Sequence, residues 1–145
     1  MTPHRWLGRA FALLLAALSW SASAQNVADM KPQKVGPNSW YVQGLAALGS
    51  PANQNFISNA GFVVAPQGVV VIDALGSPAL ARRLVQKIAE ITPKPITHVI
   101  VTHYHADHIY GLQVFKELGA QIVAQQDART YLNSDTAAQR LVASR

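Results

Sequence analysis

Residues 101–111, VTHYHADHIYG, hold three of the five histidines of the chain within six consecutive positions. The first of them, Val101, ends the sequence ITHVIV at residues 96–101, which is apolar enough to form a buried strand. In α/β folds, functional groups gather on loops at the carboxyl ends of strands. Alternate residues of an extended segment share a face, so His103, His105 and Asp107 are expected to point together. A curl of the backbone would let His108 join them, and the stretch therefore predicts a functional cluster at a strand end.

The donor groups in this cluster are those that zinc prefers. Neutral imidazole and carboxylate groups at short spacing can hold one or two divalent ions. Because the chain has no cysteine, a metal would have to be held by histidine and carboxylate. Simpler roles are open for single residues, since Asp107 could be only the N-cap of a following helix, and His105 and His108 could be exposed loop residues. His98 stands outside the pattern, and we interpret it as a hydrogen-bonded histidine within a strand.

The flanking sequence alternates between strand and helix patterns. Valine-rich runs at residues 62–65 and 69–72 flank Pro-Gln-Gly, which predicts a hairpin. Ser77 and Pro78 fit the N-cap and first position of a helix, which the sequence TPKP at residues 92–95 ends. Further predicted elements are strands at residues 39–43, 96–101 and 121–124, a helix from the histidine cluster to Leu118, and a helix at 127–133. Strands joined through helices imply parallel neighbours, so the order predicts an α/β layered domain.

The amino terminus is typical of a secretory signal. It has a basic start with Arg5 and Arg9, an apolar run at residues 10–18, and the small residues Ala-Ser-Ala before Gln25. The alternative of a membrane anchor is disfavoured, because the apolar run is about half the roughly 20 residues needed to span a bilayer. We therefore predict a signal peptide at residues 1–24, an irregular lead-in at 25–37 and a domain at 38–145, with the mature protein secreted or periplasmic.

The charge of the chain argues against a nucleic-acid partner. Removal of residues 1–24 takes away two arginines and no acidic residue, so the formal charge falls from +5 to +3. The remaining basic residues are scattered and form no aromatic and basic face suited to a nucleic-acid strand. We expect a small-molecule substrate, no nucleic acid, and no membrane association after signal cleavage.

Two segments resemble a known family. THYHADH at residues 102–108 resembles the HxHxDH signature of the metallo-β-lactamase-fold hydrolases, and VVVIDALG at residues 69–76 resembles that family's strand ending in aspartate. The resemblance covers residues 35–129. It implies an αβ/βα sandwich with one or two Zn²⁺ ions. Metal-bound hydroxide would then attack an amide or ester-type carbonyl, such as that of a β-lactam or a thioester.

The resemblance also implies roles for single residues. His103 and His105 would bind the first zinc ion, and Asp107 and His108 the second, with Asp107 also the catalytic residue. Asp73 would lie beside the metal loop without binding the metal itself, or it could be only the polar end of a strand.

The chain departs from the family pattern in two respects. Tyr110 stands where the family has the first of two glycines, while Gly111 keeps the second, and no histidine follows His108 to supply the ligands that the family places downstream. We therefore expect only the amino-terminal half of the sandwich, with one sheet face uncovered. The chain would be a fragment of an exported hydrolase. The alternatives are a truncated, non-catalytic metal-binding or interaction protein that retains half of the zinc site, and a product without function.

Overall fold

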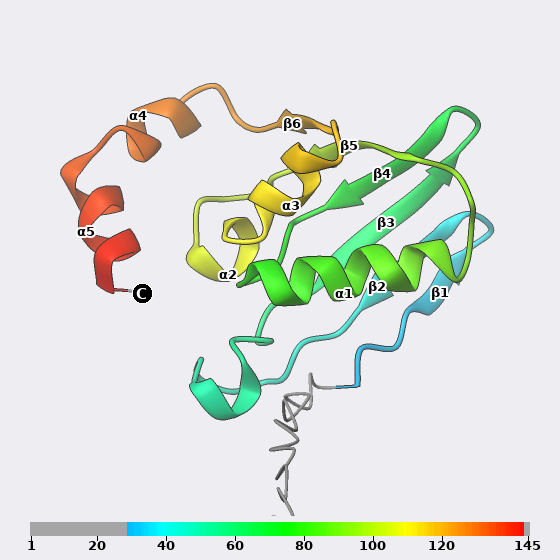
Figure 1. Ribbon diagram of the computed structural model, residues 1–145, viewed down its shortest axis with the longest axis horizontal. Helices are drawn as coiled ribbons and strands as arrows, with labels where there is room; N and C mark the ends of the chain where they lie inside the picture. Colours follow the sequence, from blue (N-terminus) through cyan, green and yellow to red (C-terminus); the bar gives the residue numbers. More distant parts are fainter. Residues whose placement is uncertain (1–28, 144–145) are drawn as a thin grey trace, which may run out of the picture.

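A single mixed sheet of six strands, in the order β1-β2-β3-β4-β5-β6, forms the body of the protein (Figure 1). The computed structural model describes residues 29–143, so the predicted signal peptide at 1–24 lies outside the described residues. The strands are β1 (Gln33–Gly36), β2 (Ser39–Val42), β3 (Ala60–Ala65), β4 (Gly68–Ile72), β5 (Ile96–Ile100) and β6 (Gln121–Val123). The α-helices are α1 (Pro78–Ala89), α2 (Ala106–Ile109), α3 (Leu112–Glu117), α4 (Ala128–Leu132) and α5 (Asp135–Ala143), and a 3-10 turn spans Pro51–Asn53.

The sheet changes from antiparallel to parallel at β4. Strands β1 to β4 pair with antiparallel neighbours, whereas β4 with β5 and β5 with β6 are parallel pairs. Each parallel pair is joined through a helical connection, α1 in the first case and α2 with α3 in the second. The α/β class predicted from the strand and helix order is therefore confirmed.

Helix α1 forms where the sequence predicts it. The side chain of Ser77 accepts a hydrogen bond from the backbone N–H of Leu80 at 3.2 Å, and Pro78 occupies the first turn. The apolar stripe of the helix is buried at Leu80, Ala81, Leu84 and Ile88. This stripe belongs to the same core as Phe62, Val71 and Val99, which are partners in the sheet register and so share one face.

Two predicted segments differ from the structure. The lead-in expected to be irregular up to Pro37 contains strand β1, which pairs with β2 and places Lys34 opposite Trp40, with its Nζ 5.3 Å from the ring centroid. The helix expected from the histidine cluster to Leu118 is divided into α2 and α3. The division falls at Tyr110 and Gly111, because the Gly111 N–H leaves the helix pattern and donates to the Leu75 carbonyl oxygen at 3.1 Å.

One face of the sheet is covered by α1 and α3, and the other has no covering layer within residues 29–143 (Figure 1). Apolar side chains that alternate with the buried set remain accessible on the open face: Val63 is 36% exposed, Ile100 40% and Val123 46%. Helices α4 and α5 extend away from the sheet and bury no residue. Within residues 29–143, no helix is both long and apolar enough to cross a membrane.

Candidate metal centre

Asp73 connects the end of strand β4 to the histidine loop. Its carboxylate is buried and accepts hydrogen bonds from the Thr102 N–H at 2.9 Å and the Thr102 hydroxyl at 2.7 Å. The same carboxylate contacts Nδ1 of His108 at 2.8 Å. Asp73 therefore lies beside the loop, and it is more than the polar end of a strand.

The backbone at this junction adopts an uncommon conformation. Asp73 and Leu75 both have φ near +64°, in the left-handed region that residues other than glycine rarely occupy. Backbone hydrogen bonds hold the segment in place: the Ala74 N–H donates to the His108 carbonyl oxygen at 2.8 Å, and the Gly111 N–H donates to Leu75. A strained backbone conformation of this kind persists only where surrounding contacts hold it in place. Here the conformation directs the Asp73 side chain toward the histidine loop.

The three imidazoles of the motif gather at one place. The ring centroid of His103 lies 4.1 Å from that of His108 and 4.6 Å from that of His105. Nε2 of His108 is 3.4 Å from Oδ2 of Asp107. The loop therefore brings together the four side chains that the sequence pattern selects.

The hydrogen bonds determine which ring nitrogens are free. Because a buried carboxylate can only accept, the single hydroxyl proton of Thr102 goes to Asp73, and the Thr102 oxygen must then accept from Nδ1 of His103, 3.0 Å away. Asp73 likewise accepts from Nδ1 of His108. In the neutral form of each ring, these contacts place the proton on Nδ1 and leave the lone pair on Nε2.

The imidazole and carboxylate groups of the loop are of the types that bind zinc, but too few of them converge on one point to hold an ion. Imidazole Nε2 and carboxylate oxygen are zinc ligands, and a carboxylate bonded to Nδ1 is the usual support of such an imidazole. However, among the side chains that the structure describes, no group of three or more His, Cys, Asp or Glu residues is arranged to hold one ion. Zinc sites take at least three protein ligands, so residues 29–143 do not complete one by themselves.

Sequence reasoning missed one support of the loop and misjudged an alternative. The Ser58 hydroxyl is buried and donates to the Asp107 carbonyl oxygen, which anchors the loop to the segment before β3. No sequence signal marked Ser58. The alternative role of Asp107 as a helix N-cap is wrong, because α2 begins at Ala106 with His105 at the N-cap position. His98 lies in β5 with Nδ1 3.0 Å from the Thr97 hydroxyl, as expected of a hydrogen-bonded strand histidine.

The sequence model of the metallo-beta-lactamase superfamily matches residues 54–132, more than half of the chain. The chain belongs to this superfamily. The matched range contains Asp73, the histidine loop and the strands that position them.

Curated relatives include enzymes of two descriptions. The type 2 metallo-beta-lactamase of Elizabethkingia meningoseptica is 26% identical over 135 residues, which are 93% of this chain and 52% of that protein. The type 2 metallo-beta-lactamase of Bacillus cereus is 32% identical over 72 residues, 50% of this chain and 28% of that protein. A linear primary-alkylsulfatase from Pseudomonas sp. (strain ATCC 19151) is 34% identical over 53 residues, 37% of this chain and 10% of that protein. The chain thus spans about half the length of these relatives or less.

A solved structure agrees with this assignment at the level of the fold. The metallo-beta-lactamase from Pontibacter korlensis superimposes with a TM-score of 0.61 at 16% sequence identity. The match covers 74% of this chain and 48% of that chain. The six-stranded sheet and its helices are therefore a partial metallo-beta-lactamase fold, as the sequence resemblance implied.

Proposed function

We propose that this superfamily member acts as an exported zinc-dependent hydrolase that cleaves an amide or ester-type carbonyl. The observation that carries the proposal is the buried contact of Asp73 with Nδ1 of His108, in a loop where the His103 ring lies against those of His105 and His108. In the neutral rings of His103 and His108, Nδ1 is held by Thr102 and Asp73, which leaves Nε2 as the atom that can bind a metal. The signal-like pattern of residues 1–24 supports the export part of the proposal.

The described residues would contribute binding and orientation. His103 and His105 would hold one zinc ion, Asp107 and His108 a second, and Asp73 with Thr102 would fix the orientation of the rings. When bound, zinc would supply a water molecule of lowered pKa and a Lewis acid for the carbonyl oxygen. Further ligands would have to join these four side chains, because the described residues offer two for each ion.

Two substrate classes are compatible with this chemistry, a β-lactam amide and a thioester. The relatives described as metallo-beta-lactamases favour the β-lactam. Incubation of the zinc-loaded chain with a chromogenic β-lactam and with an acyl thioester measures both reactions directly. Turnover of one substrate and not the other would assign the class.

Zinc binding by the loop is tested through His108, with His98 as a matched control. The change His108→Ala removes one proposed ligand, and we expect zinc affinity to fall by about tenfold or more in equilibrium dialysis. The change His98→Ala removes a histidine of the same sheet that lies outside the loop, and it should leave zinc affinity unaltered. Equal zinc affinity of the His108→Ala variant and the unaltered chain would reject the proposed ligand set.

A non-catalytic metal-binding protein is the second candidate. It is favoured by one observation, that no three ligand side chains among the described residues converge on one ion. It predicts zinc binding that depends on His108 together with no turnover of either substrate. Zinc-dependent turnover by the 145-residue chain would exclude it.

A further inference from the structure

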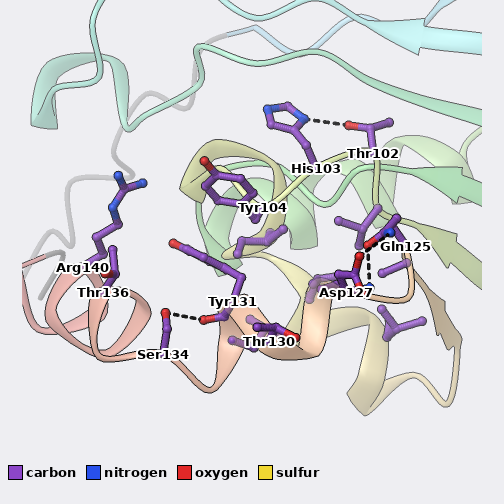
Figure 2. A pocket seen from close by; sticks show the side chains of 17 residues that line it. Thr102, His103, Tyr104, Gln125, Asp127, Thr130, Tyr131, Ser134, Thr136 and Arg140 are labelled. Carbon is purple, nitrogen blue, oxygen red and sulfur yellow. Dashed lines mark hydrogen bonds between the residues drawn. The ribbon is translucent and has the colours of Figure 1, made fainter.

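An open cavity of about 700 Å³ lies between the histidine loop, the end of the sheet and helices α4 and α5 (Figure 2). Its volume lies within the range of small-molecule sites. Apolar side chains from the loop, α2, α3, β6 and α4 line much of its wall: Val101, Ile109, Leu112, Ile122 and Leu132. His103 lines the same cavity, so a molecule bound there would adjoin the proposed metal centre.

Two tyrosines, Tyr104 in the loop and Tyr131 in α4, line this cavity and contact each other. The ring centroids of Tyr104 and Tyr131 are 4.3 Å apart. Tyr104 stands between His103 and His105 in the loop. In Figure 2 the hydroxyl ends of both tyrosines point toward the side of the cavity on which Arg140 lies. The cavity therefore has an apolar body and one end with the guanidinium of Arg140, the hydroxyl groups of the two tyrosines and that of Thr136.

Arg140 supplies a positive charge at that end. Within residues 29–143 its guanidinium makes no ion pair, whereas Arg82 pairs with Glu117 across 4.0 Å. The acid that also lines the cavity, Asp127, lies on the opposite side in Figure 2 and is hydrogen-bonded to Gln125. The charges of the cavity are therefore separated, and an anion is favoured only at the Arg140 end.

Arg140 also faces the other side of the histidine loop. A second open cavity, of about 990 Å³, is lined by Arg140 together with Asp107 and Ser77. Arg140 is the side chain that the two cavities share. An anion held by Arg140 would thus lie between the cavity of His103 and that of Asp107.

We propose that the cavity binds a small amphiphilic anion, with a hydrocarbon chain or ring against the apolar wall and a single carboxylate or sulfate on Arg140. The identification of this molecule as the substrate rests on the proposed hydrolase function. The binding site itself does not, because none of the groups that form it needs the metal.

Binding is tested on the full chain in the presence of a chelator, with octanoate, octyl sulfate and octanol as ligands in calorimetric titration. The three ligands share a chain length and differ in the head group. The two anions therefore compare the binding of a carboxylate with that of a sulfate, and octanol measures the contribution of the hydrocarbon chain without a charge. We expect at least one anion to bind with 1:1 saturation about fivefold to tenfold more tightly than octanol.

Variants assign that preference to Arg140. The change Arg140→Gln should remove the preference for the anion, Arg140→Lys should retain part of it, and the matched change Arg129→Gln in α4 should leave it intact. The change Tyr131→Ala should weaken the binding of all three ligands. Equal binding of octanol and both anions, or an anion preference that survives Arg140→Gln, would overturn the proposal.

The outcomes for site and function are separable. Anion binding that depends on Arg140, in a chain that hydrolyses nothing when loaded with zinc, would leave the site standing and reject the hydrolase. Hydrolysis without such binding would reject the site alone.

Discussion

Asp73 accepts hydrogen bonds from the backbone and hydroxyl of Thr102 and from His108, and these contacts join strand β4 to the histidine loop. Its backbone is held at φ +64°, a conformation that asparagine tolerates about as well as aspartate. The change Asp73→Asn therefore tests the carboxylate without disturbing the backbone preference. Thr102 in turn contacts Nδ1 of His103, so Asp73 also influences the orientation of that ring.

The first prediction concerns the stability that Asp73 provides. Replacement by asparagine leaves an amide N–H₂ facing groups that donate, so we expect the free energy of unfolding to fall by about 2 kcal/mol. Urea denaturation followed by circular dichroism measures this change. The exposed acid Asp135 is the control, and Asp135→Asn should alter stability by less than about 0.5 kcal/mol. Equal effects of the two changes would contradict the assigned role of Asp73.

The second prediction concerns the tautomer of His103. The change Thr102→Val keeps the shape of the side chain but removes the acceptor for Nδ1–H of His103. Zinc affinity should then fall by about tenfold, because the ring is no longer held with Nε2 free. Competition with a chromogenic chelator gives the affinity, and nitrogen chemical shifts of the imidazole give the tautomer.

Thr97 and His98 provide a matched control for this change. They form the same kind of contact, at 3.0 Å, in strand β5 and outside the loop. The change Thr97→Val should therefore leave zinc affinity unchanged. A loss of affinity in Thr97→Val equal to that in Thr102→Val would show that the effect is not specific to the loop.

At the level of elements, the joint between α2 and α3 packs directly on the segment that follows β4. A Cβ atom added at Gly111 would collide with the Ala74 carbonyl oxygen and would lie 2.7 Å from the Cβ of Ala81. Gly111 thus allows a close backbone approach, even with Tyr110 at the position before it. As a result, the end of the histidine loop packs directly on α1 and on the segment that follows Asp73.

The third prediction tests this packing. We expect Gly111→Ala to lower the free energy of unfolding by about 1–3 kcal/mol, because backbone and helix must separate to admit one methyl group. Denaturant titration measures the loss. An added Cβ at Gly36 would meet only ordinary contacts, the nearest at 3.5 Å, so Gly36→Ala should have a much smaller effect. A Gly111→Ala variant as stable as the unaltered chain would refute the close contact.

Over the whole molecule, the two faces of the sheet differ in their contact with solvent. Phe62, Val71 and Val99 are sealed beneath the helices, while Val63, Ile100 and Val123 remain accessible on the opposite face. An apolar sheet face of this kind attracts other apolar surface. The uncovered face expected for half of a layered fold is therefore present in the structure.

The fourth prediction follows from that open face. The 145-residue chain should bind a fluorescent apolar dye in its folded state and self-associate as its concentration rises. The double change Val63→Thr and Ile100→Thr should reduce dye fluorescence by about half or more, because it makes two central positions of the face polar while keeping their β-branched shape. Light scattering measures association in parallel. Unchanged dye binding in the double variant would place the apolar surface elsewhere.

Most strands and the first long helix were predictable because their signals are local. Valine-rich runs mark β3 and β4, and Ser77 followed by proline marks the start of α1. Strand β1 carried no such signal, since its residues are mostly exposed and its pairing with β2 decides its conformation. The break between α2 and α3 was equally hidden, because it depends on a bond from Gly111 to Leu75, which lies in another segment.

The sequence by itself determined the superfamily and the four candidate ligands, because the side chains of residues 103–108 are neighbours in the chain and their spacing is visible without a fold. The tertiary structure alone decided how these side chains are supported. Asp73 is separated from Thr102 by 29 positions and from His108 by 35, and Ser58 is separated from Asp107 by 49. Such contacts arise from the register of β4 against β5 and from the packing of the loops beyond them. Neither can be read from the local pattern of apolar and polar residues in the sequence.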